Sequence, residues 1–100
     1  MSKSIMQMKD ARTVCWGCGC TPQERWLEEH HVFGASNRKH SEHYGLKVYL
    51  CYRCHRDNKE GIHGCNTELR QRLFEAGQQA FEKEHGTREE FMQIFGRNYL

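Results

Sequence analysis

Residues 46–55, LKVYLCYRCH, place a CxxC pair, the pattern of a metal-binding knuckle, directly at the end of a strand-like run. Apolar side chains occupy every second position of this run, which is the period of a half-buried strand: Leu46, Val48 and Leu50. The following residues 52–60, YRCHRDNKE, include no β-branched side chain and end before Gly61. They predict a helix of two to three turns with a glycine cap.

A partner strand is predicted upstream, in residues 25–33, RWLEEHHVF. Val32 and Phe33 favour extended structure. The polar stretch 34–45, GASNRKHSEHYG, then indicates the long loop of a hairpin. His40 and His43 fall in this loop, where we expect solvent-exposed side chains.

Two further helices are predicted near the C-terminus. The first begins at an N-cap, Asn66 or Thr67, and ends before Gly86. Its apolar residues recur at helical spacing: Leu69, Leu73, Ala76, Ala80 and Phe81. The second begins with the capping-box pattern of residues 87–90, TREE, and ends at Gly96.

The composition describes one small domain with a thin core. The chain has 100 residues, of which only seventeen are Leu, Ile, Val or Phe. A chain this short usually needs a staple besides apolar burial. The net charge of +2 permits a polyanionic partner without demanding one. Residues 1–14 show neither a secretion signal nor a membrane span, so we expect a cytoplasmic protein without membrane contact.

Six cysteines provide the candidate staple. Two CxxC knuckles lie about thirty residues apart, and two such pairs can hold structural zinc tetrahedrally: Cys15, Cys18, Cys51 and Cys54. The alternatives are buried free cysteines or a redox pair. Cys20 and Cys65 are interpreted as non-ligands, although Cys20 could replace a member of the first knuckle. Trp16 and Trp26 are expected to pack against the knuckle and the hairpin.

A second cluster contains imidazoles and no thiolate. His30 and His31 close the first predicted strand, and His55 follows Cys54. A zinc-pinned hairpin and helix would bring these histidines together. Glu28 and Glu29 could support a histidine, but a surface position is the simpler interpretation.

The sequences EHHV (29–32) and LCYRCH (50–55) resemble the HNH endonucleases of the ββα-metal fold, including those with two zinc knuckles. The resemblance covers Cys15 to about His63. It implies that His30 and His55 bind one catalytic divalent cation such as Mg²⁺ or Mn²⁺, and that His31 is the general base. The implied substrate is DNA. The tail, ending FGRNYL (95–100), resembles small phage-associated HNH proteins, which implies a bacterial or phage-encoded protein.

The sequence departs from the family pattern in two places. The Asn that normally precedes the second strand is absent, and the candidates to substitute for it are Asn37 and Asn58. The position one helical turn after His55 is Lys59, so His63 is the remaining candidate for a further ligand. Adjacent residues on a regular strand also point to opposite faces, so His30 and His31 can share a site only at a strand end or bulge.

The predicted fold is therefore α+β. A zinc-stapled ββα-metal core over residues 15–65 follows a polar segment, 1–14, and precedes C-terminal helices, 66–100, that pack on it. The expected function is metal-dependent hydrolysis of DNA. The alternatives are a non-catalytic zinc-knuckle module that binds nucleic acid or protein, and a metal-handling protein. Four basic residues are candidates for phosphate contacts: Arg38, Lys39, Arg53 and Arg56.

Overall fold

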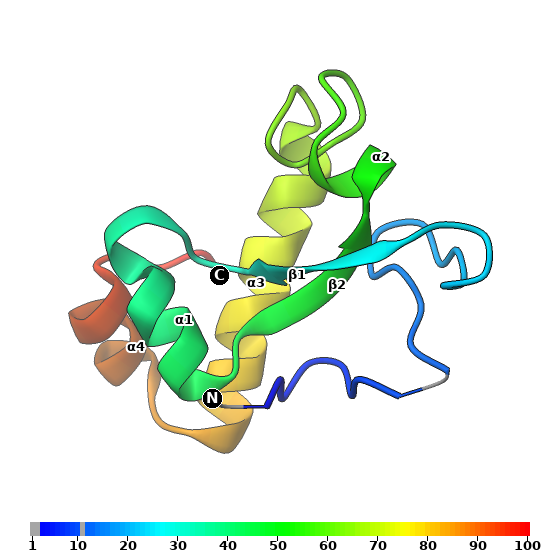
Figure 1. The fold of residues 1–100 in the computed structure, drawn as a ribbon. Helices are drawn as coiled ribbons and strands as arrows, with labels where there is room; N and C mark the ends of the chain where they lie inside the picture. Colours follow the sequence, from blue (N-terminus) through cyan, green and yellow to red (C-terminus); the bar gives the residue numbers. More distant parts are fainter. Residues whose placement is uncertain (1–2, 11) are drawn as a thin grey trace.

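The computed structural model describes residues 3–10 and 12–100. Strands β1 (Leu27–His31) and β2 (Lys47–Cys51) form a two-stranded antiparallel sheet in which Leu27 pairs with Cys51 and His31 with Lys47. The other elements are helical (Figure 1): η1 (Ala35–Asn37), α1 (Arg38–Tyr44), α2 (Tyr52–His55), α3 (Thr67–Glu84) and α4 (Arg88–Phe95). This is the mixed α and β architecture expected from the sequence.

Strand β2 is buried on both faces, so the prediction of a half-buried strand is wrong. Every residue from Lys47 to Cys51 is buried. The reason is the N-terminal segment, which lies along β2: the Gln7 side chain accepts a hydrogen bond from the Tyr49 amide at 2.8 Å, and the Ser4 hydroxyl donates to the Lys47 carbonyl. The N-terminal segment therefore covers the face of β2 that carries Lys47 and Tyr49. The polar side chains of this face had predicted that it would be exposed.

The connection between the strands is helical rather than a simple loop, which corrects the prediction for residues 34–45. Helix α1 contains no β-branched residue and ends at Gly45, whose φ of 72° suits a glycine cap. Ser41 is fully buried, and its hydroxyl bonds to both the amide and the carbonyl of Phe33, at 2.9 and 3.0 Å. His40 and His43 consequently lie on a helix, and the His40 ring is half-buried beside Phe95.

Helix α2 is a single turn, shorter than the two to three turns predicted. The Asp57 carboxylate accepts hydrogen bonds from the amides of Lys59 and Glu60, at 3.0 and 2.9 Å, and so stabilises a turn that competes with the helix. The chain then folds back on α2. The Ile62 amide donates to the Cys54 carbonyl at 2.8 Å, and the His63 amide to the His55 carbonyl at 3.1 Å.

The two C-terminal helices have the predicted caps. The Asn66 side chain accepts from the Leu69 amide at the start of α3. Thr87 and Glu90 form the complete capping box at the start of α4. Gly96 ends α4 with a φ of 85°.

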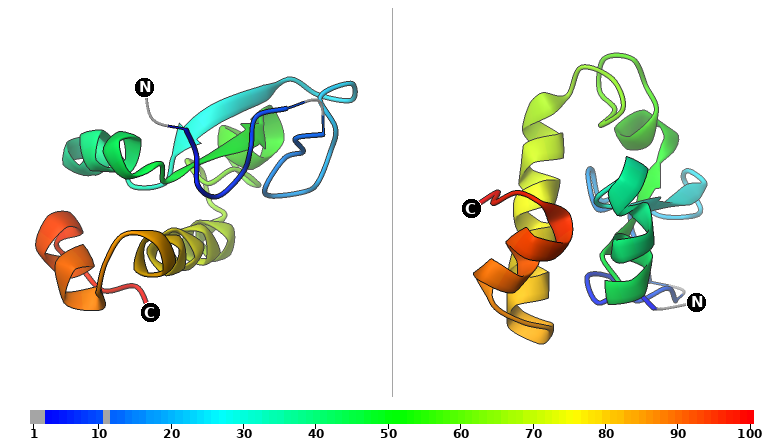
Figure 2. Two further views of the ribbon diagram at one scale, coloured as in Figure 1. Left: turned by 90° about the horizontal axis from the view of Figure 1, so that it is seen from below. Right: turned by 90° about the vertical axis from the view of Figure 1, so that its left-hand side faces the viewer.

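The molecule has two layers, with the hairpin and α1 on one side and α3 and α4 on the other (Figure 2). Phe33 joins the layers, because the centroid of its ring lies 4.8 Å from that of Phe95 and 5.4 Å from that of Phe91. Residues from both layers thus belong to one hydrophobic core. Across the described part of the chain, no helix has the length and apolar character needed to cross a membrane.

Candidate metal centres

Four cysteines gather at the base of the hairpin and form a thiolate cluster: Cys15, Cys18, Cys51 and Cys54. Their sulfur atoms all lie within 4.8 Å of one another. A tetrahedral zinc site with Zn–S bonds of about 2.3 Å has S···S edges of about 3.8 Å. The Sγ atoms of Cys18 and Cys51 are 3.8 Å apart. The cluster can therefore bind a metal such as zinc.

The surroundings of Cys51 favour a thiolate. Burial acts to raise its pKa, but hydrogen bonds from the Cys54 backbone, the neighbouring thiols and the Arg25 guanidinium together lower it to about 6. Cys20 lies beside the cluster, and burial together with its neighbours Cys18 and Cys51 raises its pKa to about 12. Cys65 is an exposed free cysteine. Both spare cysteines thus lie outside the group of four.

An imidazole cluster forms separately from the thiolates, and its members are His30, His55 and His63. The Nε2 atoms of His55 and His63 are 3.0 Å apart, and the His30 ring centroid lies 4.9 Å from that of His55. The fold-back of residues 62–63 onto α2 supplies His63. The structure therefore brings together three of the histidines singled out in the sequence.

Burial favours the neutral form of two rings of the imidazole cluster, His30 and His63. Burial, and then the nearby His55, His63 and His31, lower the pKa of His30 to about 3. Burial and His55 also lower the pKa of His63. A metal ligand must be an unprotonated imidazole. The lowered pKa values of His30 and His63 favour the unprotonated ring that divalent-cation binding requires.

Glu28 supports the imidazole cluster, contrary to the surface position favoured by the sequence. Its Oε1 atom lies 2.9 Å from Nδ1 of His55 and 3.1 Å from Nε of Arg56. Both contacts lower the pKa of Glu28, the one with His55 more strongly. A carboxylate on the second ring nitrogen fixes the tautomer of a ligating histidine. It leaves Nε2 of His55 free to face a metal.

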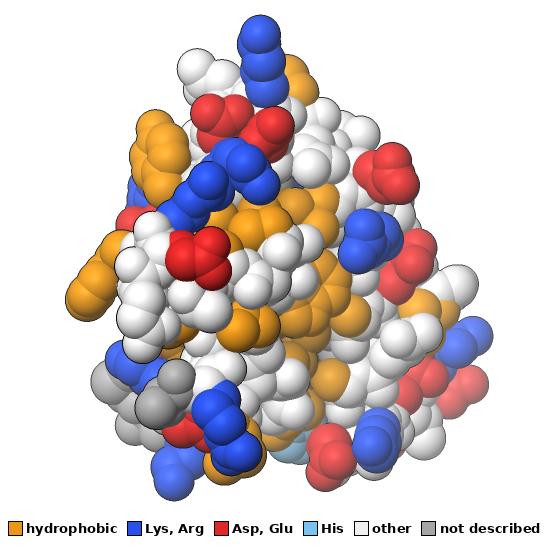
Figure 3. All heavy atoms as spheres, turned by 90° about the vertical axis from the view of Figure 1, so that its right-hand side faces the viewer, with side chains coloured by type: hydrophobic (Ala, Val, Ile, Leu, Met, Phe, Trp, Pro, Cys, Tyr) orange, Lys and Arg blue, Asp and Glu red, His pale blue; other side chains and the backbone are white. Residues whose placement is uncertain are grey.

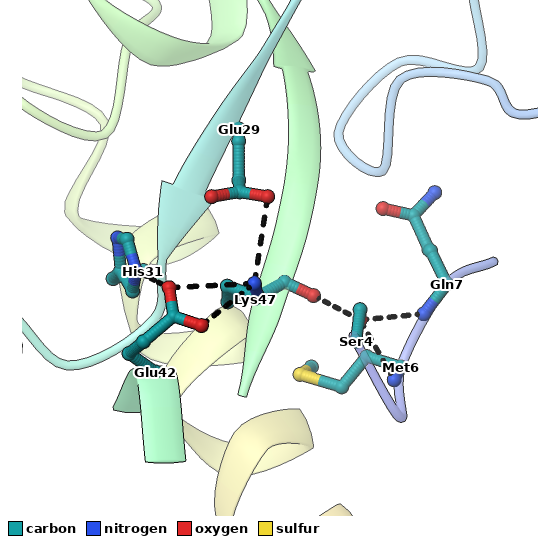
Figure 4. Close-up of polar contacts among 7 residues, drawn as sticks. All are labelled: Ser4, Met6, Gln7, Glu29, His31, Glu42 and Lys47. Carbon is teal, nitrogen blue, oxygen red and sulfur yellow. Dashed lines mark hydrogen bonds and ion pairs between the residues drawn. The ribbon is translucent and has the colours of Figure 1, made fainter. Parts of the chain in front are cut away.

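His31 does not join His30 and His55, contrary to the expectation that these histidines would meet; it lies in a different group, with Glu29 and Glu42 (Figure 4). Strand β1 keeps a regular register, so His30 and His31 point to opposite faces. Nε2 of His31 is 3.0 Å from Oε1 of Glu42. Lys47 is 2% exposed, and its Nζ atom lies 3.2 Å from Glu42 and 3.5 Å from Glu29. The Glu42 carboxylate thus holds His31, the predicted base. The buried ammonium group of Lys47 balances the charge of this carboxylate.

The four predicted phosphate contacts lie on two sides of the sheet. Arg38 and Lys39 line an open groove of about 600 Å³ together with His31 and Glu42. Arg53 pairs with Glu60 at 3.0 Å, and Arg56 contacts Glu28. Arg38 and Lys39 therefore lie beside His31, and Arg56 lies beside Glu28, the partner of His55. Arg53 instead lines a pocket together with Cys18 and Cys54 of the thiolate cluster.

The structure shows one contact for each Asn named as a substitute. The Asn37 side chain donates to the Phe95 carbonyl at 3.0 Å and so ties η1 to α4. Asn58 lies in the loop after α2, where its carbonyl accepts from the Cys65 amide.

Two features escaped the sequence analysis. The pairing of Glu42 with His31 depends on a helix that was predicted as a loop. Trp26 was expected to pack on the hairpin, but it is 83% exposed. Trp16 is half-buried against the hydrophobic core, as expected for a residue of the knuckle.

No protein family matches this chain, and neither curated proteins nor solved structures show a significant match to it.

Proposed function

We propose that this protein is a metal-dependent endonuclease of the HNH type that hydrolyses DNA phosphodiester bonds. The observation that carries the proposal is the separation of two chemically different clusters. Four thiolates make a closed site suited to structural zinc. Three imidazoles make a site with room for further ligands, because His30 is half-buried and His63 is exposed.

The imidazole cluster fits a catalytic divalent cation by the chemistry of its donors. Neutral nitrogen ligands leave a bound cation enough positive charge to stabilise the developing charge on a phosphate and its leaving oxygen. His30, His55 and His63 would hold the ion. Glu28 would keep His55 in the tautomer that presents Nε2.

His31 is proposed as the general base. When Nε2–H of His31 donates to Glu42, Nδ1 becomes the acceptor that can take a proton from an attacking water. Because His30 and His31 occupy opposite faces of β1, the phosphate would have to lie across the end of this strand. Arg38 and Lys39 in the adjoining groove are placed to contact the DNA backbone there.

The test is cleavage of plasmid DNA by the purified full chain with Mg²⁺ or Mn²⁺, in parallel with EDTA. We expect EDTA to stop cleavage while the fold and the thiolate-bound zinc remain, because three imidazoles bind a cation less tightly than four thiolates. His30→Ala and His55→Ala should raise the metal concentration needed for half-maximal activity. His43→Ala, at an exposed position on α1, is the matched control.

A non-catalytic nucleic-acid-binding module is the second candidate, and the missing Asn favours it. Undiminished cutting in EDTA that strips exchangeable metal would contradict the one-metal mechanism. Binding of DNA without cleavage under every metal condition would favour the binding module.

A further inference from the structure

Two aromatic side chains are exposed at one end of the hairpin. Trp26 is 83% exposed and Tyr52 is 63% exposed. Trp26 immediately precedes Leu27 and Tyr52 immediately follows Cys51, and these two residues are paired in the sheet. The rings therefore flank the same end of the hairpin. A chain with so few apolar residues gains nothing in stability from leaving its largest side chain in water.

Tyr52 also belongs to the same helical turn as both metal clusters. Helix α2 buries Cys54 of the thiolate cluster and His55 of the imidazole cluster. The same turn exposes Tyr52 and Arg53. The exposed aromatic ring is thus anchored rigidly beside the candidate catalytic cation site.

Arginines are neighbours of the exposed aromatic residues in the chain. Arg25 precedes Trp26, and Arg53 and Arg56 follow Tyr52 in the chain. The side chains of Arg53 and Arg56 are 48% and 57% exposed, and each uses Nε for its ion pair with a glutamate. The exposed parts of both guanidinium groups can contact phosphates. On the side of the molecule that carries the knuckles and α2, hydrophobic side chains project beside Lys and Arg side chains (Figure 3).

We propose that Trp26 and Tyr52 form a stacking site for unpaired bases of single-stranded DNA. Aromatic side chains stack on the faces of unpaired bases with little dependence on sequence, and neighbouring cations follow the backbone. Bases inside a duplex have both faces covered by their neighbours, so they cannot use such rings. This inference rests on the proposed function and gives its substrate class, DNA with a single-stranded segment next to the scissile phosphate.

The test measures binding of a fluorescent 20-nucleotide single strand and of the matching duplex, with EDTA present so that no cutting occurs. We expect tighter binding of the single strand. Trp26→Ala and Tyr52→Ala should each weaken it by about 5- to 100-fold. Trp26→Phe and Tyr52→Phe, which keep an aromatic face, should retain most of the affinity.

Two control variants separate the contribution of the aromatic rings to binding from other contributions. Met92→Ala removes a hydrophobic side chain that is 42% exposed on α4, far along the chain from the hairpin end, and should bind as wild type. Arg53→Gln should reduce the salt dependence of binding, whereas the ring variants should not. Zinc content and circular dichroism of every variant establish that the fold is retained.

Equal affinity for the single strand and the duplex, or wild-type binding by folded Trp26→Ala and Tyr52→Ala, would overturn this inference. Its failure is distinguishable from failure of the proposed function. A chain that binds single strands through the rings but never cleaves supports the stacking site alone. A chain that cleaves but ignores both ring substitutions supports the nuclease alone.

Discussion

At the scale of single residues, we expect each cysteine of the thiolate cluster to stabilise the fold. Cys51 is fully buried between β2 and α2, and its sulfur lies 3.8 Å from that of Cys18. We predict that Cys51→Ser gives a zinc-free, largely unfolded protein, because the thin core needs the metal to fold. Elemental analysis and thermal unfolding measure this. Cys65→Ser, at an exposed cysteine, is the control. Retention of zinc and melting temperature by Cys51→Ser would contradict the assignment.

His31 is a residue whose substitution should affect chemistry more than folding. We predict that His31→Ala lowers the cleavage rate by roughly 10²- to 10⁴-fold, the usual contribution of a general base. Zinc content should not change, since His31 lies outside the thiolate cluster. Single-turnover cleavage measures the effect. Glu42→Gln, which keeps a hydrogen-bond acceptor at His31, should cost less. Wild-type turnover by His31→Ala would remove this residue from the mechanism.

At the scale of elements, α3 packs closely at Gly77 against the residues that follow β1. A Cβ added to Gly77 would lie 2.8 Å from Cγ1 of Val32 and 3.1 Å from the Phe33 ring. Val32 and Phe33 are both 2% exposed, so neither can move aside easily. Glycine therefore lets the helix pack directly on the hairpin layer.

We predict that Gly77→Ala destabilises the protein although alanine is the better helix former. Helix propensity favours alanine by about 1 kcal/mol. Overpacking a dense core costs about 1–3 kcal/mol, so the net change should be neutral to destabilising by about 2 kcal/mol. Urea unfolding measures it. Gln79→Ala, on the exposed side of α3, should leave stability unchanged or slightly higher. A clearly stabilised Gly77→Ala would show that the layers are less tightly packed than described.

At the scale of the whole molecule, the imidazole cluster links folding to pH. The pKa of His30 is about 3 in the folded chain, mainly because of burial, against an ordinary value of 6.5. Between these values the unfolded chain binds a proton that the folded chain excludes. Protons therefore favour the unfolded chain, and stability falls as pH is lowered from 6.5 towards 3.

We predict that, with exchangeable metal removed, the free energy of unfolding decreases between pH 6.5 and 5 by at most about 1.4 kcal/mol per pH unit from His30. Urea unfolding at several pH values measures the slope. His30→Asn removes the titrating ring and should give a shallower slope. His43→Asn, at an exposed position, should keep the wild-type slope. Identical slopes for His30→Asn and wild type would contradict the link.

Features that depend on nearby residues could be predicted from the sequence. The caps at Asn66 and Thr87 and the glycine stop at Gly96 are contacts within one turn of the chain, and they are found as expected. The CxxC spacing likewise predicted the four cysteines that gather. The opposite orientations of His30 and His31 follow from the period of a strand, and the regular register of β1 agrees with this rule.

Features that depend on distant segments were decided by the tertiary structure. The second buried face of β2 exists because residues 3–7 cover it, and α1 replaces the expected loop where Ser41 bonds to Phe33. His63 joins the imidazole cluster because residues 62–63 fold back on α2. Trp26 stays exposed because no described segment covers its side chain. Local patterns fix caps and periodicity, whereas the burial of a face depends on which remote segment packs against it.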